Sequence, residues 1–398
     1  MTHWKETILA MNEREGRGYR ALYLYFFISY IARSFPALAP KLYAEKGMGE
    51  GLIGVMTSVP SLVAMAFMPL LGSLADRAPR KRTVLLFEHL LMAAACFLFG
   101  AMRTFPGMLA AATLCVIFSN ASMPNAVSIA LEHCGQVRKP YGPVRMIGTV
   151  GYQAGLLLSA VLLARNLDGL YPCMGAAALL AGAAACLMPA VKGHQHGRQN
   201  VRLTQLFSDS HLRWLYGIIL FGTVSTQFYS SFFAKYLGDM GMSNSRISII
   251  TFLSVLLEVP FLWFGDRIKR LTNVWNWLLI GLLLNGVRWL GLALFRQTLP
   301  IVLIQTLAVT TLALFEFIPA FYLRSRVRPE LLGRAQSMLT FISFGAGNVI
   351  GGMLGGLVAE KTGIAPVFAF NGAMLLLGAA ALYRPTRRLI REDEENPT

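Results

Sequence analysis

The sequence predicts an all-α polytopic membrane protein, with twelve transmembrane helices in two six-helix bundles and both termini in the cytoplasm. Of the 398 residues, 55% are hydrophobic and 14% are charged, whereas soluble domains carry about 25% charged residues. Apolar runs of about 20 residues, long enough to cross a bilayer, recur along the whole chain. The basic residues gather between alternate runs. This composition excludes an ordinary soluble enzyme and leaves no room for a separate soluble domain.

The apolar runs fall into two sets of six on either side of a polar stretch. A hydropathy window places the first set at residues 20–43, 52–75, 83–102, 106–131, 143–165 and 169–191. It places the second set at residues 212–238, 244–265, 274–296, 299–323, 333–360 and 364–384. We therefore predict an N-terminal bundle over 1–191, a linker over 192–211 and a C-terminal bundle over 212–398.

The orientation follows from the Lys and Arg residues. Of the 36, 26 lie on the side that holds both termini and the linker, and eight lie on the other side. Because cytoplasmic loops are enriched in Lys and Arg, that first side is expected to be cytoplasmic. Residues 1–20 are polar and have no cleavable apolar segment, so the first span should remain in the mature chain. We expect a multi-pass protein of a bacterial cytoplasmic (inner) membrane.

The net charge of +16 could also indicate a nucleic-acid-binding protein. Here, however, the basic residues form short clusters between spans and not one stripe with interleaved aromatics, so we expect membrane lipids and no nucleic acid as partners. The five cysteines have no metal-site spacing, and no metal is expected.

The two halves repeat one another weakly. Ala75-Asp76-Arg77 follows the second span, and Gly265-Asp266-Arg267 follows the eighth. Gly142 opens the fifth span, and Gly333 opens the eleventh. Two related bundles are typical of transporters whose solute site lies at the interface between the halves.

The loop after the second span carries a family signature. The segment Gly72-Ser73-Leu74-Ala75-Asp76-Arg77-Ala78-Pro79-Arg80-Lys81-Arg82 resembles the loop motif of the major facilitator superfamily, with Pro79 where a Gly is commoner. The resemblance implies a conformational switch that includes Gly72, Asp76, Arg77, Arg80 and Lys81, with Asp266 and Arg267 as the second-half counterparts. The alternative is a loop that only fixes topology.

A second motif narrows the branch. The segment Tyr141-Gly142-Pro143-Val144-Arg145-Met146-Ile147-Gly148-Thr149-Val150-Gly151-Tyr152 resembles span five of nucleoside-proton symporters, lactose permease relatives and phenylpropionate permeases. The resemblance implies acidic coupling residues and a solute site made of Arg145, Thr149, Tyr152, Gln227, Ser230, Glu258 and Glu316. Ser230 and Val255 depart from the amides expected at their positions.

Ionisable groups inside spans are costly, so they are functional candidates by default. Glu258 and Glu316 each lie seven residues from a cytoplasmic end, at about 10 Å depth, where two carboxylates could share a proton. We expect Glu316 to carry the proton with the help of Glu258, and a structural ion pair is the alternative. Glu88 and His89, near the start of the third span, are expected to be structural, with a loop Arg as partner.

Three arginines complete the candidate site. Arg288 is either the counter-charge of Glu316 or a snorkelling side chain. Arg33 lies near the midplane and should meet a carboxylate or bind an anionic solute group. Arg145 and Thr149 are one turn apart and share a helix face. The alternative for Arg145 is that it only contributes to the positive charge that orients the chain in the membrane. The glycines of the fifth and eleventh spans fit close helix packing: Gly148, Gly151, Gly155, Gly345, Gly347, Gly351, Gly352, Gly355 and Gly356.

These features favour a proton-coupled symporter, without cofactors and working as a monomer, that imports a small polar organic solute such as a nucleoside, a sugar or an aromatic acid. A proton-driven efflux antiporter is the main alternative, although the fifth span lacks the Gly-Pro pair of many antiporters. A primary pump is disfavoured because no nucleotide-binding loop occurs. An enzyme is disfavoured too, and a non-transporting membrane sensor is less favoured still. The arginines favour an acidic solute and the fifth span favours a nucleoside or sugar, so the solute stays open.

Overall fold

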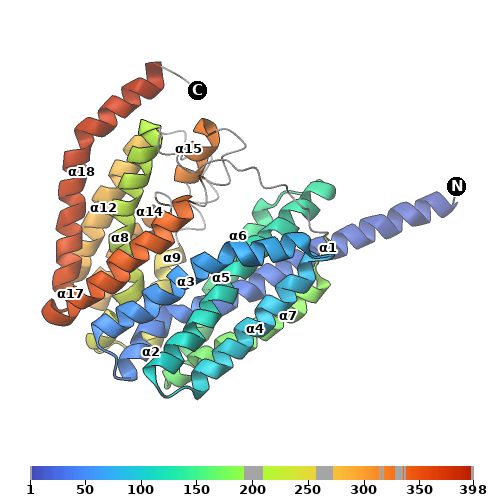
Figure 1. Ribbon diagram of the computed structural model, residues 1–398, viewed down its shortest axis with the longest axis horizontal. Coiled ribbons are helices and arrows are strands. Elements are labelled where there is room, and N and C mark those ends of the chain that lie inside the picture. The colour runs from blue at the N-terminus through green and yellow to red at the C-terminus, as the bar shows by residue number, and fades with distance from the viewer. Residues whose placement is uncertain are drawn as a thin grey trace. The chain divides into compact units, whose positions relative to one another are not determined.

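A computed structural model describes residues 2–191, 209–256, 272–312, 315, 318–327, 335 and 338–395, and within these ranges the chain is helical and has no strand (Figure 1). The first half contains α1 (Thr2–Ser34), η1 (Phe35–Leu38), α2 (Ala39–Glu45), α3 (Glu50–Arg77), α4 (Lys81–Ala101), α5 (Phe105–Gln136), α6 (Gly142–Leu162), η2 (Leu167–Gly169) and α7 (Leu170–Leu187). The second half contains α8 (Ser210–Asp239), α9 (Asn244–Leu256), α12 (Val274–Leu294), α13 (Thr298–Gln305), η4 (Thr306–Ala308), α14 (Val309–Leu312), α15 (Ile318–Arg326), the π-helical η6 (Phe341–Ala346) and η7 (Val349–Leu354), α17 (Gly355–Thr362) and α18 (Ile364–Glu395).

Nine helical segments of the described chain are long and apolar enough to cross a membrane. They are Gly18–Glu45, Glu50–Ala75, Lys81–Ala101, Phe105–Gln136, Gly142–Leu162, Leu167–Leu187, Val274–Leu294, Met338–Thr362 and Ile364–Asp393. All-helical architecture is confirmed over this part of the chain. At the other three predicted spans the structure has α8, the first part of the eighth span as α9, and the shorter helices α13 to α15.

The chain forms two compact units. The first consists of Met1–Pro36 and Pro60–Arg198, and the second of Ala37–Val59 and Gln199–Thr398. A segment from the first half of the sequence, residues 37–59, thus belongs to the same unit as the second half. Pro60 lies within α3, so one helix contributes residues to both units.

In the first unit, α1 packs along α6, and α4 packs between α5 and α7. Glycine permits the close approach of α6: a Cβ on Gly151 would lie 2.2 Å from the carbonyl oxygen of Phe27, and one on Gly155 would lie 2.9 Å from that of Ile31. These contacts involve backbone, which a side-chain rotation cannot relieve. The expectation that the fifth-span glycines serve close helix packing is confirmed.

In the second unit, α12 packs along α18, and η7 crosses α8 in the same close manner. A Cβ on Gly351 would lie 2.0 Å from the carbonyl oxygen of Val224. The segment 37–59 is held in this unit by polar contacts. Ser58 Oγ donates to the Asn348 carbonyl at 2.7 Å, and Lys41 Nζ donates to Asn244 Oδ1 at 2.6 Å.

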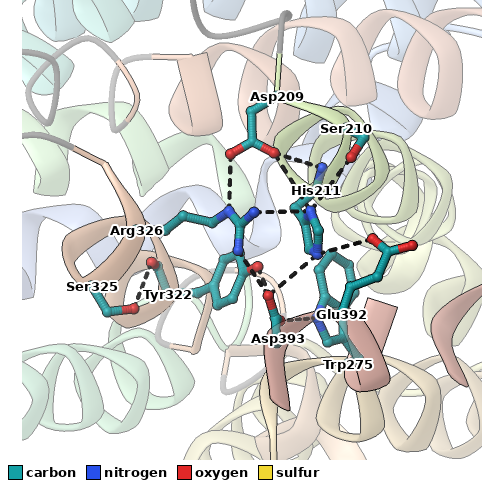
Figure 2. Close-up of polar contacts among 9 residues, drawn as sticks. All are labelled: Asp209, Ser210, His211, Trp275, Tyr322, Ser325, Arg326, Glu392 and Asp393. Atoms are coloured by element: carbon teal, nitrogen blue, oxygen red, sulfur yellow. Dashed lines mark hydrogen bonds and ion pairs between the residues drawn. The ribbon is translucent and has the colours of Figure 1, made fainter. Parts of the chain in front are cut away.

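An ionic cluster joins the ends of α8, α15 and α18 (Figure 2). Arg326 donates to Asp209 Oδ2 at 2.9 Å and to Asp393 Oδ1 at 2.7 Å, and its Nη2 lies 2.9 Å from Nδ1 of His211. Trp275 of α12 donates to the other oxygen of Asp393 at 2.9 Å. Partial burial raises the pKa of Asp209, but hydrogen bonds from Arg326 and from the His211 backbone N–H outweigh it, so the net pKa lies below the ordinary value. The cluster therefore stabilises this end of the unit chiefly when Asp209 is ionised.

Candidate functional site

The fifth-span motif places an arginine and a hydroxyl together on α6. Arg145 donates to Thr149 Oγ1 at 3.4 Å, and its guanidinium lies 5.0 Å from the ring centre of Tyr30 on α1. Thr149 is buried, while Tyr152 is partly buried and packs on the core of the first unit. The structure thus brings Arg145 and Thr149 together as expected, and adds Tyr30, which sequence reasoning did not single out.

Arg33 lies in the last turn of α1, and α5 supplies its polar partners. Its Nη2 donates to the backbone carbonyl of Ser119 and, at 3.1 Å, to the hydroxyl of Ser122. Within the described residues no carboxylate forms a direct ion pair with Arg33 or with Arg145. Glu88 of α4 is close enough for its charge to interact with that of Arg33, so serine hydrogen-bond partners and a nearby carboxylate surround this arginine together. Both expected roles of Arg33, meeting a carboxylate and binding an anionic solute group, stay predictions.

A buried carboxylate lies in the same unit. Glu88 on α4 is 2% exposed, and its Oε1 accepts a hydrogen bond from the Asn125 amide at 2.6 Å. Its Oε2 is buried and has no hydrogen-bond partner among the described residues. The expectation of a loop arginine as the partner of Glu88 is wrong, because the helix face opposite Glu88 supplies Asn125 instead. His89 beside it bonds the Leu85 carbonyl through Nδ1 at 2.9 Å.

The second unit contains an arginine in an extensive polar network. Arg288 on α12 is 2% exposed and donates through Nε to Gln305 Oε1 at 2.6 Å and through Nη1 to Thr311 Oγ1 at 3.1 Å. Its guanidinium lies 4.4 Å from the ring centre of Tyr229 and 4.5 Å from that of Trp289. Gln305 in turn donates to the Tyr229 hydroxyl at 2.8 Å. A side chain buried in this way does not snorkel, so that alternative for Arg288 is wrong.

Two expected residues of α8 have different environments. Gln227 is buried, and its amide donates to the Ser343 carbonyl at 2.8 Å. Ser230 is exposed. Tyr229 lies between them in the sequence and contacts Arg288, so the residue of this stretch that joins the polar network is one that the sequence motif did not include.

Sequence reasoning overlooked the neutral members of the network in the second unit. Gln305 is fully buried, and Asn285 is fully buried and accepts from Thr311 at 2.6 Å. The signal that could have found them is a polar, uncharged residue inside an apolar span, because such a side chain needs a partner in the bilayer.

Several expected residues fall on parts of the chain that the structure does not describe. Glu258, Glu316, Asp266 and Arg267 lie outside the described residues, and so does any contact between Glu316 and Arg288. Asp76 lies in the last turn of α3, and only its backbone is described.

The expected switch loop joins α3 to α4 in the first unit. Lys81 is buried and donates from Nζ to Ser128 Oγ at 2.8 Å, whereas Arg77 and Arg80 are exposed. A Cβ added at Gly72 would meet no atom within 4 Å, so no neighbour in this structure requires a glycine there. Lys81 thus ties the loop to α5, while the two exposed arginines remain available to lipid headgroups or to other parts of the chain.

The chain matches a known family over most of its length. Residues 19–370 match the model of the MFS_1 like family. The chain belongs to the MFS_1 like family. This confirms the resemblance to major facilitator transporters that the two sequence motifs carry, and it makes the chain a member of a transporter family.

Two relatives show the range of proteins similar to this chain. The maltose permease of Geobacillus stearothermophilus is 26% identical over 388 residues, which cover 94% of this chain and 95% of that protein. The putative nucleoside transporter YegT of Escherichia coli (strain K12) is 24% identical over 349 residues, covering 80% and 79%.

Among solved structures, the nucleoside transporter NupG superposes with a TM-score of 0.81 at 17% identity, over 92% of this chain and 98% of that one. A bacterial homolog of the human lysosomal transporter Spinster, in an inward-facing and occupied conformation, superposes with a TM-score of 0.71 at 16% identity, over 96% and 98%. At these identities the likeness establishes the fold alone. The family assignment, and not the structural likeness, supports a membrane transporter.

Proposed function

We propose that this protein is a secondary active transporter of a bacterial inner membrane that imports a small polar organic solute together with protons. It works by alternating access between two six-helix bundles, residues 1–191 and 212–398, joined by a cytoplasmic linker. Both termini lie in the cytoplasm, twelve helices span the membrane, and the protein acts as a monomer without a cofactor.

The observation that carries the proposal is the environment of the membrane-embedded arginines. Arg33 and Arg145 in the first unit contact serine, threonine and tyrosine side chains, and neither forms a direct ion pair with a described carboxylate, although Glu88 interacts with Arg33 at longer range. Placing a charge in a span costs a few kcal/mol at least. A structural ion pair would reduce that cost, so two arginines whose hydrogen-bond partners are all neutral favour a binding role in which the solute supplies the acceptor atoms.

The solute site in this proposal takes groups from both halves. Arg33, Arg145, Thr149 and Tyr152 contribute donors from the first half, and the second half contributes Gln227, Ser230 and Glu258. Proton coupling rests on Glu316 and Glu258, with Arg288 as the counter-charge. Donors on one side and an amide and a carboxylate on the other suit a hydroxylated or acidic solute, such as a nucleoside, a sugar or an aromatic acid.

Proton uptake on solute addition tests the proposal directly. Weakly buffered, de-energised cells that express the protein receive nucleosides, sugars and aromatic acids in turn, beside cells that express Glu316→Gln. Symport predicts a transient alkalinisation of the medium with one solute class and no such signal for the variant, because a glutamine cannot carry the proton.

Solute exchange in proteoliposomes without a gradient provides the control. The Glu316→Gln protein should still exchange labelled solute, since exchange needs no net proton movement. If no solute class alkalinises the medium, import by proton symport is refuted. Proton release on solute addition would instead support the efflux antiporter, and solute binding without any flux would support a sensor.

A further inference from the structure

The last helix extends beyond the membrane. The apolar part of α18, residues 364–383, is about 30 Å long at 1.5 Å per residue, which matches the thickness of the hydrocarbon core. The helix continues to Glu395. The segment from Arg384 onwards therefore lies at the depth of the lipid headgroups, on the cytoplasmic side in the proposed orientation.

One face of this extension is fixed to the rest of the second unit. Thr386, Leu389 and Ile390 are buried, and Asp393 accepts hydrogen bonds from Arg326 and Trp275 (Figure 2). Because the end of α18 is held on this side, the opposite face has a defined position relative to α8.

The opposite face carries four arginines, which we name the arginine face: Arg384, Arg387, Arg388 and Arg391. Their spacing places them on one side of a helix, and all four are exposed. No ion pair joins any of them to a carboxylate whose side chain the structure describes, and the Arg387 guanidinium lies 5.2 Å from the Tyr383 ring centre. Four exposed positive charges at headgroup depth attract anions.

Two cavities open along the arginine face. One, of about 380 Å³, is lined by Arg384 and Arg388 together with Ser210, Trp214 and Glu392. The other, of about 560 Å³, is lined by all four arginines with Tyr383 and Ile390. Among the described residues Glu392 is the one acidic group that lines them, and its carboxylate lies 3.5 Å from Nε2 of His211 on the fixed side. Guanidinium groups bind phosphate oxygens in pairs, so these cavities suit a phosphate ester.

The helix below the cavities indicates that this phosphate ester belongs to a lipid. Phe370 and Leu377 precede Arg384 at steps of seven residues, on the same helix face, and their side chains are 65% and 72% exposed. Trp214 and Tyr383 beside the arginines are aromatic residues at the depth where such side chains contact headgroups. An apolar stripe that ends in arginines is complementary to acyl chains that end in an anionic headgroup.

We propose that the arginine face, with Trp214, binds the phosphodiester headgroup of an anionic phospholipid of the cytoplasmic leaflet. The lipid's acyl chains then lie along Leu377 and Phe370. The bound lipid connects α8 to the end of α18, whose inner face is already joined to α15 by the ionic cluster. The site uses no residue of the proposed solute or proton pathway, and depends on the proposed function only through the orientation of the chain.

Binding of defined lipids to the purified full-length protein tests this site. Native mass spectrometry in detergent measures the affinity for phosphatidylglycerol, for the zwitterionic phosphatidylcholine and, separately, competition by inorganic phosphate. We expect phosphatidylglycerol to bind more tightly than phosphatidylcholine and inorganic phosphate not to displace it. The double variant Arg384→Gln/Arg388→Gln should bind phosphatidylglycerol about 25-fold more weakly, since each arginine near an anionic headgroup is worth roughly fivefold.

A matched control removes the same charge elsewhere. Arg20→Gln/Arg138→Gln changes two exposed arginines of the first unit on the same side of the membrane, and should bind both lipids as the unmodified protein does. Equal affinity for the two lipids, unchanged affinity in the Arg384/Arg388 variant, or an equal loss in the control variant would each overturn the proposal. Displacement by inorganic phosphate would make this a site for a soluble anion and would overturn the assignment to a lipid.

Discussion

Replacing Arg288 by lysine should destabilise the second unit while keeping its charge. The guanidinium donates in two directions at once, to Gln305 at 2.6 Å and to Thr311 at 3.1 Å, and lies over two aromatic rings. A lysine ammonium is a compact charge that cannot keep both hydrogen bonds and both ring contacts from one position. Arg288→Lys therefore tests geometry separately from charge.

The size of the effect follows from the interactions that a lysine cannot make. One hydrogen bond from a charged group contributes about 1.5–3 kcal/mol, and a weakened contact with an aromatic ring about 0.5–1 kcal/mol. Together they give a decrease in stability of about 2–4 kcal/mol. A folded unit of this size loses roughly 2–4 °C of melting temperature per kcal/mol, so we expect a decrease of about 5–15 °C.

Thermal unfolding of the purified protein in detergent measures this decrease. The control is Arg296→Lys, because Arg296 is exposed just beyond the end of α12 and has room for either side chain. That variant should change the melting temperature by no more than about 1–2 °C, as surface substitutions usually do.

Equal melting temperatures for Arg288→Lys and the unmodified protein would refute this account of the network. It would mean that the two hydrogen bonds and the ring contacts contribute nothing that an ammonium cannot supply. A large decrease in Arg296→Lys would refute it as well, because the effect could then not be attributed to the buried geometry.

Two further predictions concern packing and charge. Gly151→Ala should lower the free energy of unfolding by about 1–3 kcal/mol, because its Cβ would lie 2.2 Å from a backbone oxygen. Gly217→Ala is the control: no atom lies within 4 Å of its Cβ, so the change should be neutral or slightly stabilising. Equal effects of the two changes on thermal unfolding would contradict the close crossing. Since the pKa of Asp209 is lowered in the folded state, its contribution to stability is present above the unfolded pKa of about 4 and is lost as the pH falls through the folded value. Arg326→Gln should remove most of that contribution. The melting temperature of the variant at pH 7 should then be lower, and it should fall less than that of the unmodified protein as the pH is lowered. The same dependence of melting temperature on pH in both proteins would contradict the role given to Arg326.

Much of the fold could be predicted because a bilayer imposes a simple rule. Every backbone polar group in the hydrocarbon must be bonded within its own segment, so a run of about 20 apolar residues becomes a helix whatever its neighbours are. The role of the glycines could be predicted from their spacing. Gly148, Gly151 and Gly155 lie on one helix face, and a face of small residues in a membrane helix usually packs on another helix. The periodicity alone could not tell which helix packs there.

The polar contacts were harder to predict because they depend on which spans are neighbours. The sequence motif found Arg145 and Thr149, which lie on one helix, and their hydrogen bond is local. The partners of Glu88 and Arg288 come from other helices, at Asn125 and Gln305, and hydropathy contains no information about that pairing. A neutral amide in an apolar span is a weaker signal in the sequence than a charged residue, although its side chain also needs a hydrogen-bond partner in the bilayer.

The two units repeat their packing but not their chemistry. In each unit a glycine of the later helix lies against a backbone oxygen of an earlier one, Gly151 against Phe27 and Gly351 against Val224. Glycine is required at both crossings because any side chain there forces the helices apart. The polar residues are free to diverge, so the arginines of the first unit contact serine and threonine while Arg288 lies against two aromatic rings. Packing is therefore the feature that the two units share, and the partners of the buried arginines are the feature that distinguishes them.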